Sequence, residues 1–181
     1  MNIYIVSGIV LVILFIWFLY NSIIVSKMRV SEALSQIDVQ LKRRADLIPN
    51  LVETVKGYAK HEKELFEKVT KERANLVSAK AVSEKAKANS QLSETFKSIF
   101  AIAESYPELK ASQNFLELQE EVSDTENKIA YARQFYNSVV LDYNTKLKVF
   151  PNVIFANLLN FKESEFFGAT DEEKKPVNVK F

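Results

Sequence analysis

The sequence predicts an all-α protein in which a single N-terminal transmembrane helix is followed by an antiparallel up-and-down bundle of three long or four shorter helices. Three observations lead to this class. The 181 residues include only 3 Gly and 4 Pro, about 4% together where an average protein has roughly 12%, which predicts few turns and long elements. Residues 1–26 carry no charged side chain, and much of the remainder repeats apolar residues at alternating steps of three and four, the spacing of helices with one buried face.

The first 26 residues form the predicted membrane anchor. Between residues 3 and 20, 16 of 18 positions are apolar, and the run continues through Val25 to the roughly 20 residues that cross a bilayer. A secretory signal peptide is the alternative. However, no Lys or Arg precedes the apolar run and no small-residue cleavage site follows it. We therefore expect a retained, single-pass anchor.

The charges that flank the anchor predict its orientation. No cation precedes it, whereas five follow it closely, namely Lys27, Arg29, Lys42, Arg43 and Arg44. Because basic residues remain on the inner side of a membrane, we expect the N-terminus outside the cell membrane and the domain formed by residues 27–168 in the cytoplasm.

A helix with a narrow apolar seam is predicted beyond the anchor. Its seam positions step by fours and threes, with Arg44 as the one polar member: Val30, Leu34, Ile37, Leu41, Arg44, Ile48, Leu51, Val55 and Tyr58. Pro49 lacks a backbone donor and crowds the preceding turn, so we expect a kink or a tight break near Ile48. Leu65, Phe66, Val69, Leu76 and Val77 extend the pattern to about Ala79.

A connection and a shorter helix come next. Residues 78–90 contain Val82 as their one large apolar residue, which predicts an exposed helix end and a connection at the end of the bundle far from the membrane. A helix follows with the same spacing and is closed by Pro107; its seam is Leu92, Phe96, Ile99, Ala103 and Tyr106.

The last long helix has the clearest pattern. Six residues lie seven apart, namely Phe115, Val122, Ile129, Tyr136, Tyr143 and Phe150, and Pro151 stops the run after about 36 residues, roughly 54 Å of helix. Short connections make neighbouring helices antiparallel. A parallel homodimeric coiled coil is the alternative, but it would leave the apolar face of the middle helix uncovered.

Two segments follow Pro151. Residues 153–167 are rich in Ile, Leu and Phe, and they predict a short helix that caps the bundle, a partner surface or an interfacial membrane contact. Residues 169–181 form a charged C-terminal tail that we expect to be flexible.

The composition argues against most chemistry. With no Cys and a single histidine, His61, the chain lacks the usual zinc, di-iron and nucleophilic patterns, and we place His61 on the surface. Gly8, Gly57 and Gly168 are too scattered for a phosphate loop. We expect no enzyme activity, cofactor, metal or small-molecule substrate. The 24 basic and 23 acidic residues also argue against nucleic acid as a partner.

Two polar groups remain as candidates for a site. Arg44 occupies a seam position, where a charge must be paired, so we expect Arg44 and Asp46 to pair with Glu121, Asp124 or Glu126. The alternative is that the Arg43-Arg44 cluster binds anionic headgroups or an acidic partner. Along the last helix lie Asn127, Arg133, Asn137 and Asn144. Of these, we expect Asn137 and Asn144 to form interhelical hydrogen bonds rather than to bind ligands.

Two segments carry a family resemblance. The run IDVQLKRRADLIPNLVETVKGYA (residues 37–59) and the run LQEEVSDTENKIAYARQFYNSVVLDYN (residues 118–144), followed by Phe150-Pro151, resemble the LemA family of bacterial membrane-anchored helical proteins. The resemblance covers about residues 20–168. It implies a single-pass anchor with the N-terminus outside and an antiparallel bundle inside, and it supplies no reaction.

Anchor, bundle and missing chemistry together predict a non-enzymatic scaffold or adaptor that recruits a protein partner, of unknown identity, to the membrane. The alternative is a structural, self-associating protein that organises the membrane as a homo-oligomer.

Overall fold

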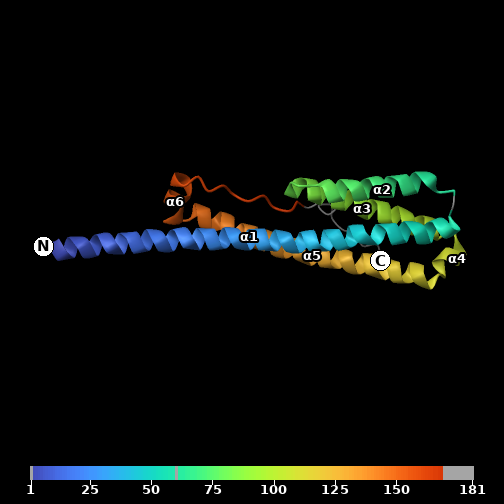
Figure 1. Ribbon diagram of the computed structural model, residues 1–181, viewed down its shortest axis with the longest axis horizontal. Coiled ribbons are helices and arrows are strands. Elements are labelled where there is room, and N and C mark those ends of the chain that lie inside the picture. Colours follow the sequence, from blue (N-terminus) through green and yellow to red (C-terminus); the bar gives the residue numbers. More distant parts are fainter. Residues whose placement is uncertain (1, 60, 169–181) are drawn as a thin grey trace, which may run out of the picture. The chain divides into compact units, whose positions relative to one another are not determined.

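The computed structural model describes residues 2–59 and 61–168, and within them it is all-helical, with no strand. This confirms the predicted fold class. Six helices follow in order (Figure 1): α1 (Asn2–Tyr58), α2 (Lys63–Ser78), α3 (Val82–Ala103), the single turn α4 (Pro107–Lys110), α5 (Gln113–Lys148) and α6 (Asn152–Leu158). The tail of residues 169–181, which we expect to be flexible, lies outside the described residues.

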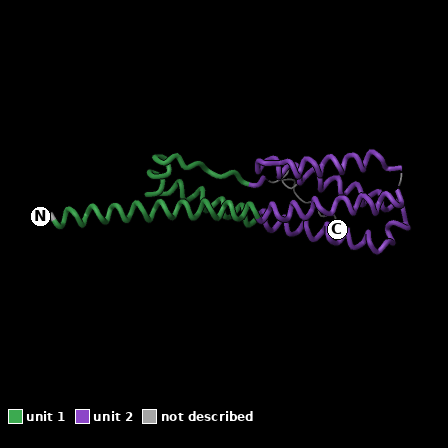
Figure 2. The backbone as a smooth tube through the Cα atoms, viewed as in Figure 1, with its two compact units in different colours: residues 1–35, 134–166 green, residues 36–133, 167–181 purple. Residues whose placement is uncertain are grey.

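The described chain divides into two compact units, which Figure 2 distinguishes by colour. One unit contains residues 36–133 together with 167 and 168. It is an up-and-down bundle in which α1, α2, α3 and α5 alternate in direction (Figure 1). Its core is apolar and includes Ile37, Leu51, Val69, Leu92 and Ile99. These residues occupy the seam positions that the heptad spacing predicts.

The other unit contains residues 2–35 and 134–166. It consists of the first part of α1, the last part of α5, α6, and an irregular segment over residues 159–166, which we call the strap. Leu19, Ile23, Val140 and Leu147 are buried in this unit. The apolar seam of α5 ends at Leu147, because α5 itself ends at Lys148 and leaves Phe150 exposed. The prediction that Phe150 belongs to the seam was wrong.

Helix α1 does not end at Pro49. It continues to Tyr58 with Pro49 inside it, although a proline cannot donate the hydrogen bond that the carbonyl four residues earlier would accept. That carbonyl belongs to Ala45, and it accepts a hydrogen bond from Arg73 Nε of α2 at 3.0 Å. A side chain from a neighbouring helix therefore replaces the missing backbone donor.

Two predicted boundaries in the middle of the chain were wrong. Residues 65–77 do not extend the first helix, since the chain turns after Tyr58 and returns as α2. Residues 82–90 do not form a connection, since α3 begins at Val82. The few large apolar residues there suggested a loop, but small side chains such as Ala88, which is buried, allow helices to pack closely.

One described helix is long and apolar enough to cross a membrane, judged by its length and composition, and it is α1. The large apolar side chains from Ile3 to Phe18 are exposed. A core helix of a water-soluble protein would bury one face of such a segment.

Candidate functional site

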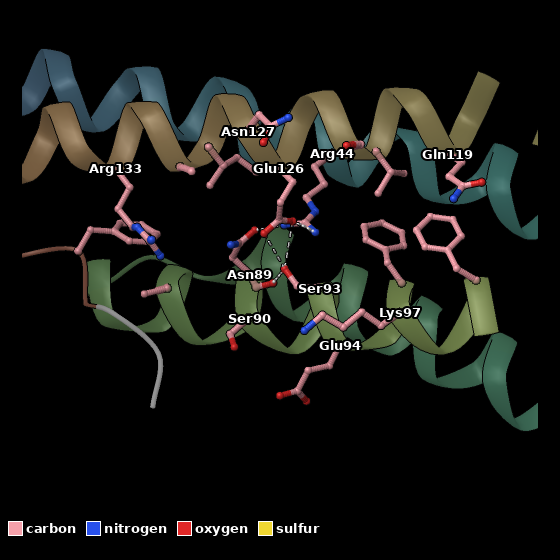
Figure 3. Close-up of a pocket in the computed structure, with 18 residues that line it drawn as sticks. Arg44, Asn89, Ser90, Ser93, Glu94, Lys97, Gln119, Glu126, Asn127 and Arg133 are labelled. Atoms are coloured by element: carbon pink, nitrogen blue, oxygen red, sulfur yellow. Dashed lines mark hydrogen bonds and ion pairs between the residues drawn. The ribbon is translucent and has the colours of Figure 1, made fainter. Parts of the chain in front are cut away.

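A groove of about 680 Å³ lies between α3 and α5 of the described bundle (Figure 3). Helix α3 contributes Asn89, Ser93 and Lys97, and α5 contributes Glu126, Asn127 and Arg133 on the facing side. Arg44 of α1 also lines the groove. The α3–α5 groove therefore combines three of the four long helices of its unit.

Arg44 is buried, with 1% of its side chain exposed, and it is held by three different contacts. It forms an ion pair with Glu126, its Nη1 donates to Asn89 Oδ1 at 2.7 Å, and its guanidinium lies 5.0 Å from the centre of the Phe96 ring. Its Nε has no hydrogen-bond partner. Burial lowers the pKa of Arg44, and the charge of Glu126 opposes that shift, so the pair keeps the charge in the bundle.

Glu126 connects the buried arginine to the outside of the groove. Its side chain is 48% exposed. Ser93 Oγ lies 3.2 Å from its carboxylate and 3.1 Å from the backbone carbonyl of Asn89, and these two acceptors share the single hydroxyl hydrogen. Figure 3 shows these side chains converging from α1, α3 and α5. The groove thus offers hydrogen-bond donors, acceptors and the half-buried aromatic side chain of Phe100, whereas the ring of Phe96 is buried. Such a mixture suits the binding of a polypeptide segment.

A second arginine pair lies on the surface of the same two helices. Arg43 Nη2 is 2.7 Å from Glu121 Oε2 and 3.6 Å from Asp124 Oδ2. The hydrogen bond to Glu121 raises the pKa of Arg43. The predicted pairing of Arg44 with the last helix is confirmed through Glu126. The partners predicted for Asp46 were wrong, because Asp46 and Glu121, Asp124 and Glu126 are all carboxylates and cannot form ion pairs with one another. Those carboxylates pair with Arg43 and Arg44.

The polar residues of the last helix divide between two places. Asn127 and Arg133 line the α3–α5 groove. Asn144 instead holds the strap: its Nδ2 donates to the carbonyl of Ser164 at 2.9 Å, and its Oδ1 accepts from the amide of Ser164 at 2.8 Å. The interhelical hydrogen bond predicted for Asn144 was wrong, because its partner is a strap backbone.

The same strap explains the two seam tyrosines. Tyr136 Oη donates to the carbonyl of Glu165 at 2.7 Å, and Tyr143 Oη donates to the carbonyl of Lys162 at 3.1 Å. Burial raises the pKa of both tyrosines. Each tyrosine therefore fills the seam with its ring and binds the strap with its hydroxyl.

No group of three or more His, Cys, Asp or Glu side chains among residues 2–59 and 61–168 could hold a metal ion. His61 is exposed, as predicted.

Two groove residues, Asn89 and Ser93, were missed by sequence reasoning. A signal for Asn89 was present, because Asn89, Leu92, Phe96, Ile99 and Ala103 follow one alternation of three and four. Asn89 is thus a polar seam residue like Arg44, and the two bind each other. Ser93 follows Leu92 on α3 and is half-buried, and no spacing rule distinguishes it from the other serines of that helix.

Comparisons with known proteins give one consistent result. A family model described as LemA family matches residues 33–181. The curated Protein LemA of Metamycoplasma hominis is 25% identical over 160 residues, which cover 88% of this chain and 73% of that protein.

Proposed function

The chain belongs to the LemA family, and from this premise we propose that it is a non-enzymatic scaffold or adaptor that recruits a protein partner to the cytoplasmic surface of the cell membrane. In this proposal α1 spans the membrane once, with its N-terminus outside. The partner docks in the α3–α5 groove. Tethering restricts the partner to the membrane surface and thereby raises its effective concentration.

One observation carries the proposal, namely that α1 provides both parts of an adaptor. Its first turns are apolar and exposed, so they suit a bilayer. Further along the same helix, Arg44 forms part of the α3–α5 groove. The cations that follow the apolar segment, beginning with Lys27 and Arg29, support the proposed orientation.

The groove also favours binding over catalysis. Its central carboxylate is engaged, because Glu126 pairs with Arg44 and accepts a hydrogen bond from Ser93. A nucleophile needs an adjacent base that is free to take its proton, and the one histidine, His61, does not line the groove. We therefore propose that the groove binds a protein partner rather than a small-molecule substrate.

Site-specific photo-crosslinking in intact cells tests the proposal. A crosslinking amino acid is placed at Ser90 and at Asn127, which line opposite sides of the groove, and at the exposed Val77 of α2 as a control. The adaptor requires one foreign protein that crosslinks from both groove positions and is absent from the control. Identical patterns at all three positions, or none, would contradict groove docking. A reporter fused to the C-terminus tests the orientation, and an exported reporter would contradict it.

Self-association is the alternative function, favoured by Tyr131 and Phe135, which are exposed one turn apart on α5. Crosslinks between copies of this chain at those two positions, together with a ring or filament on sizing, would favour this structural role.

A further inference from the structure

Phe161 of the strap lies beside the end of the apolar segment of α1. The centroid of its ring is 6.3 Å from that of the Tyr20 ring and 6.0 Å from Lys27 Nζ. The amide of Phe161 donates to the carbonyl of Ala156 of α6 at 2.9 Å, so α6 directly precedes this contact. Tyr20 is the last aromatic residue of the apolar segment and Lys27 is its first cation. Seven residues of helix span about 10 Å, so the proposed membrane span of α1 would put Phe161 at the height where the hydrocarbon core meets the headgroups.

A group of large apolar side chains is exposed around α6. We call it the α6 apolar cluster, and it consists of Phe150, Ile154, Leu158 and Leu159. Phe150 is 79% exposed and Leu158 is 76% exposed. Phe150, Ile154 and Leu158 are four residues apart, and several large apolar side chains exposed this close in sequence are typical of a surface that contacts something other than water. Here the contact would occur at the height of the membrane interface.

Two basic side chains, Arg29 and Lys146, line a cavity together with Val149 and Asn152, which flank the Phe150-Pro151 step before α6. Lys146 Nζ is 3.3 Å from the backbone carbonyl and from the hydroxyl of Ser22 and also donates to Ser26 Oγ. These are neutral oxygens, and Lys146 forms no ion pair with a described carboxylate. This cavity has a volume of about 460 Å³, with Asp142 as its one carboxylate.

We propose that the α6 apolar cluster inserts into the membrane interface beside α1, and that Arg29 and Lys146 bind the phosphate of an anionic phospholipid headgroup. The inference rests on the proposed membrane span of α1 and adds a second, interfacial contact. Two cations facing one carboxylate leave a positive cavity, and a lipid phosphate at the same height supplies the missing anion. The apolar cluster then enters the acyl boundary, as interfacial helices do.

The absence of cysteine from the sequence permits a clean test with single-cysteine variants of the full chain. An environment-sensitive fluorophore is attached at Leu158→Cys, at Leu11→Cys within the span, and at Val77→Cys on α2, all exposed positions. The labelled proteins are placed in vesicles of phosphatidylcholine, with or without phosphatidylglycerol. Lipid-borne quenchers are positioned near the headgroups or deep in the acyl chains.

We expect the label at residue 158 to be quenched most by the shallow quencher, the label at residue 11 by the deep one, and the label at residue 77 by neither. Phosphatidylglycerol should increase quenching at residue 158. Arg29→Gln and Lys146→Gln should each reduce the ratio of immersed to free α6 about fivefold in those vesicles, whereas Lys128→Gln on α5 should not.

Four results would overturn the inference in distinguishable ways. If residue 158 behaves like residue 77 while residue 11 is quenched, α6 does not touch the membrane although the anchor stands. If residue 11 is not quenched, the span itself fails, and the proposed function fails with it. Energy transfer between labelled copies at residue 158 without lipid quenching would assign the cluster to self-association, and quenching that ignores phosphatidylglycerol would remove the headgroup site.

Discussion

The ion pair between Arg44 and Glu126 gives the sharpest test of the bundle. Glu126→Gln keeps the shape and one acceptor oxygen but removes the negative charge, so the buried Arg44 keeps its charge without a counterion. Breaking a fully buried pair costs about 3–5 kcal/mol. Because Glu126 is 48% exposed and only Arg44 is buried, we take about half of that value, roughly 2 kcal/mol of unfolding free energy.

The chain offers a matched control on the same helix. Glu121 has nearly the same exposure as Glu126, 47%, and it also pairs with an arginine of α1, but that arginine is 41% exposed. Glu121→Gln and Glu126→Gln therefore differ mainly in the burial of the partner. An exposed arginine regains water when its partner is lost, so we expect Glu121→Gln to have little effect.

Thermal unfolding of the full chain in detergent, followed by far-UV circular dichroism, measures the difference. For a protein of this size, roughly 2 kcal/mol corresponds to a Tm lower by about 4–8 °C in the Glu126→Gln variant. Adding Arg44→Met to that variant removes the unpaired cation and should recover part of the loss. Equal shifts for the two glutamate variants, or a further loss on adding Arg44→Met, would refute the reasoning.

Three further predictions concern the start of α3 and the strap. Ala81 has the extended backbone of an N-cap without an acceptor side chain, so Ala81→Ser should add about 1 kcal/mol of stability, seen as a higher Tm; an unchanged Tm would argue against this cap. Hydrogen bonds from the backbone amides before α3 lower the pKa of Glu84. The ionised Glu84 therefore stabilises the folded state at pH values above its ordinary pKa, and this stabilisation is lost as the pH falls through the lowered pKa of the folded state. Glu84→Gln should therefore lower Tm near pH 7 and match the parent chain well below pH 4.5, and a constant gap would contradict it. Asn144→Ala removes both hydrogen bonds to Ser164, which together contribute about 2 kcal/mol of free energy to holding the strap. The backbone amides of residues 160–166 should therefore exchange faster with deuterium, whereas those of the bundle formed by residues 36–133 should not. Equal acceleration at all amides would contradict a local role of Asn144.

Heptad spacing predicted the long elements because each depends on its own apolar face. The last helix was expected to run about 36 residues, and α5 has 36, since local periodicity suffices to detect a helix of this length. Its bounds lie two residues earlier than the expected run from Phe115 to Phe150. The turn after Tyr58 was not predicted, because residues 65–77 continue an apolar pattern that fits one helix as well as two. Whether this stretch forms one helix or two depends on packing between helices, and the spacing of apolar residues carries no information about that packing.

The groove and the strap were harder to predict for different reasons. Arg44 was identified because a charge in an apolar seam is unusual, and its pairing with the last helix follows from the cost of leaving it unpaired. The strap has no periodicity, and its side chains matter less than its backbone, which accepts hydrogen bonds from Tyr136 and Tyr143. Every residue has a backbone carbonyl, so the amino-acid sequence does not indicate which carbonyl accepts a hydrogen bond from a tyrosine.

The proline inside α1 has a consequence for how the bundle chooses among alternative alignments. Heptad seams are degenerate, because a helix shifted by seven residues presents a similar apolar stripe to its neighbour. A single carbonyl freed by Pro49 and bound by Arg73 has no equivalent one repeat away, since the sequence of α1 contains no second proline. The hydrogen bond between Arg73 and the Ala45 carbonyl can therefore form in only one register of α2 against α1. Pro49 thus selects one helix register among several that the apolar repeat alone would allow.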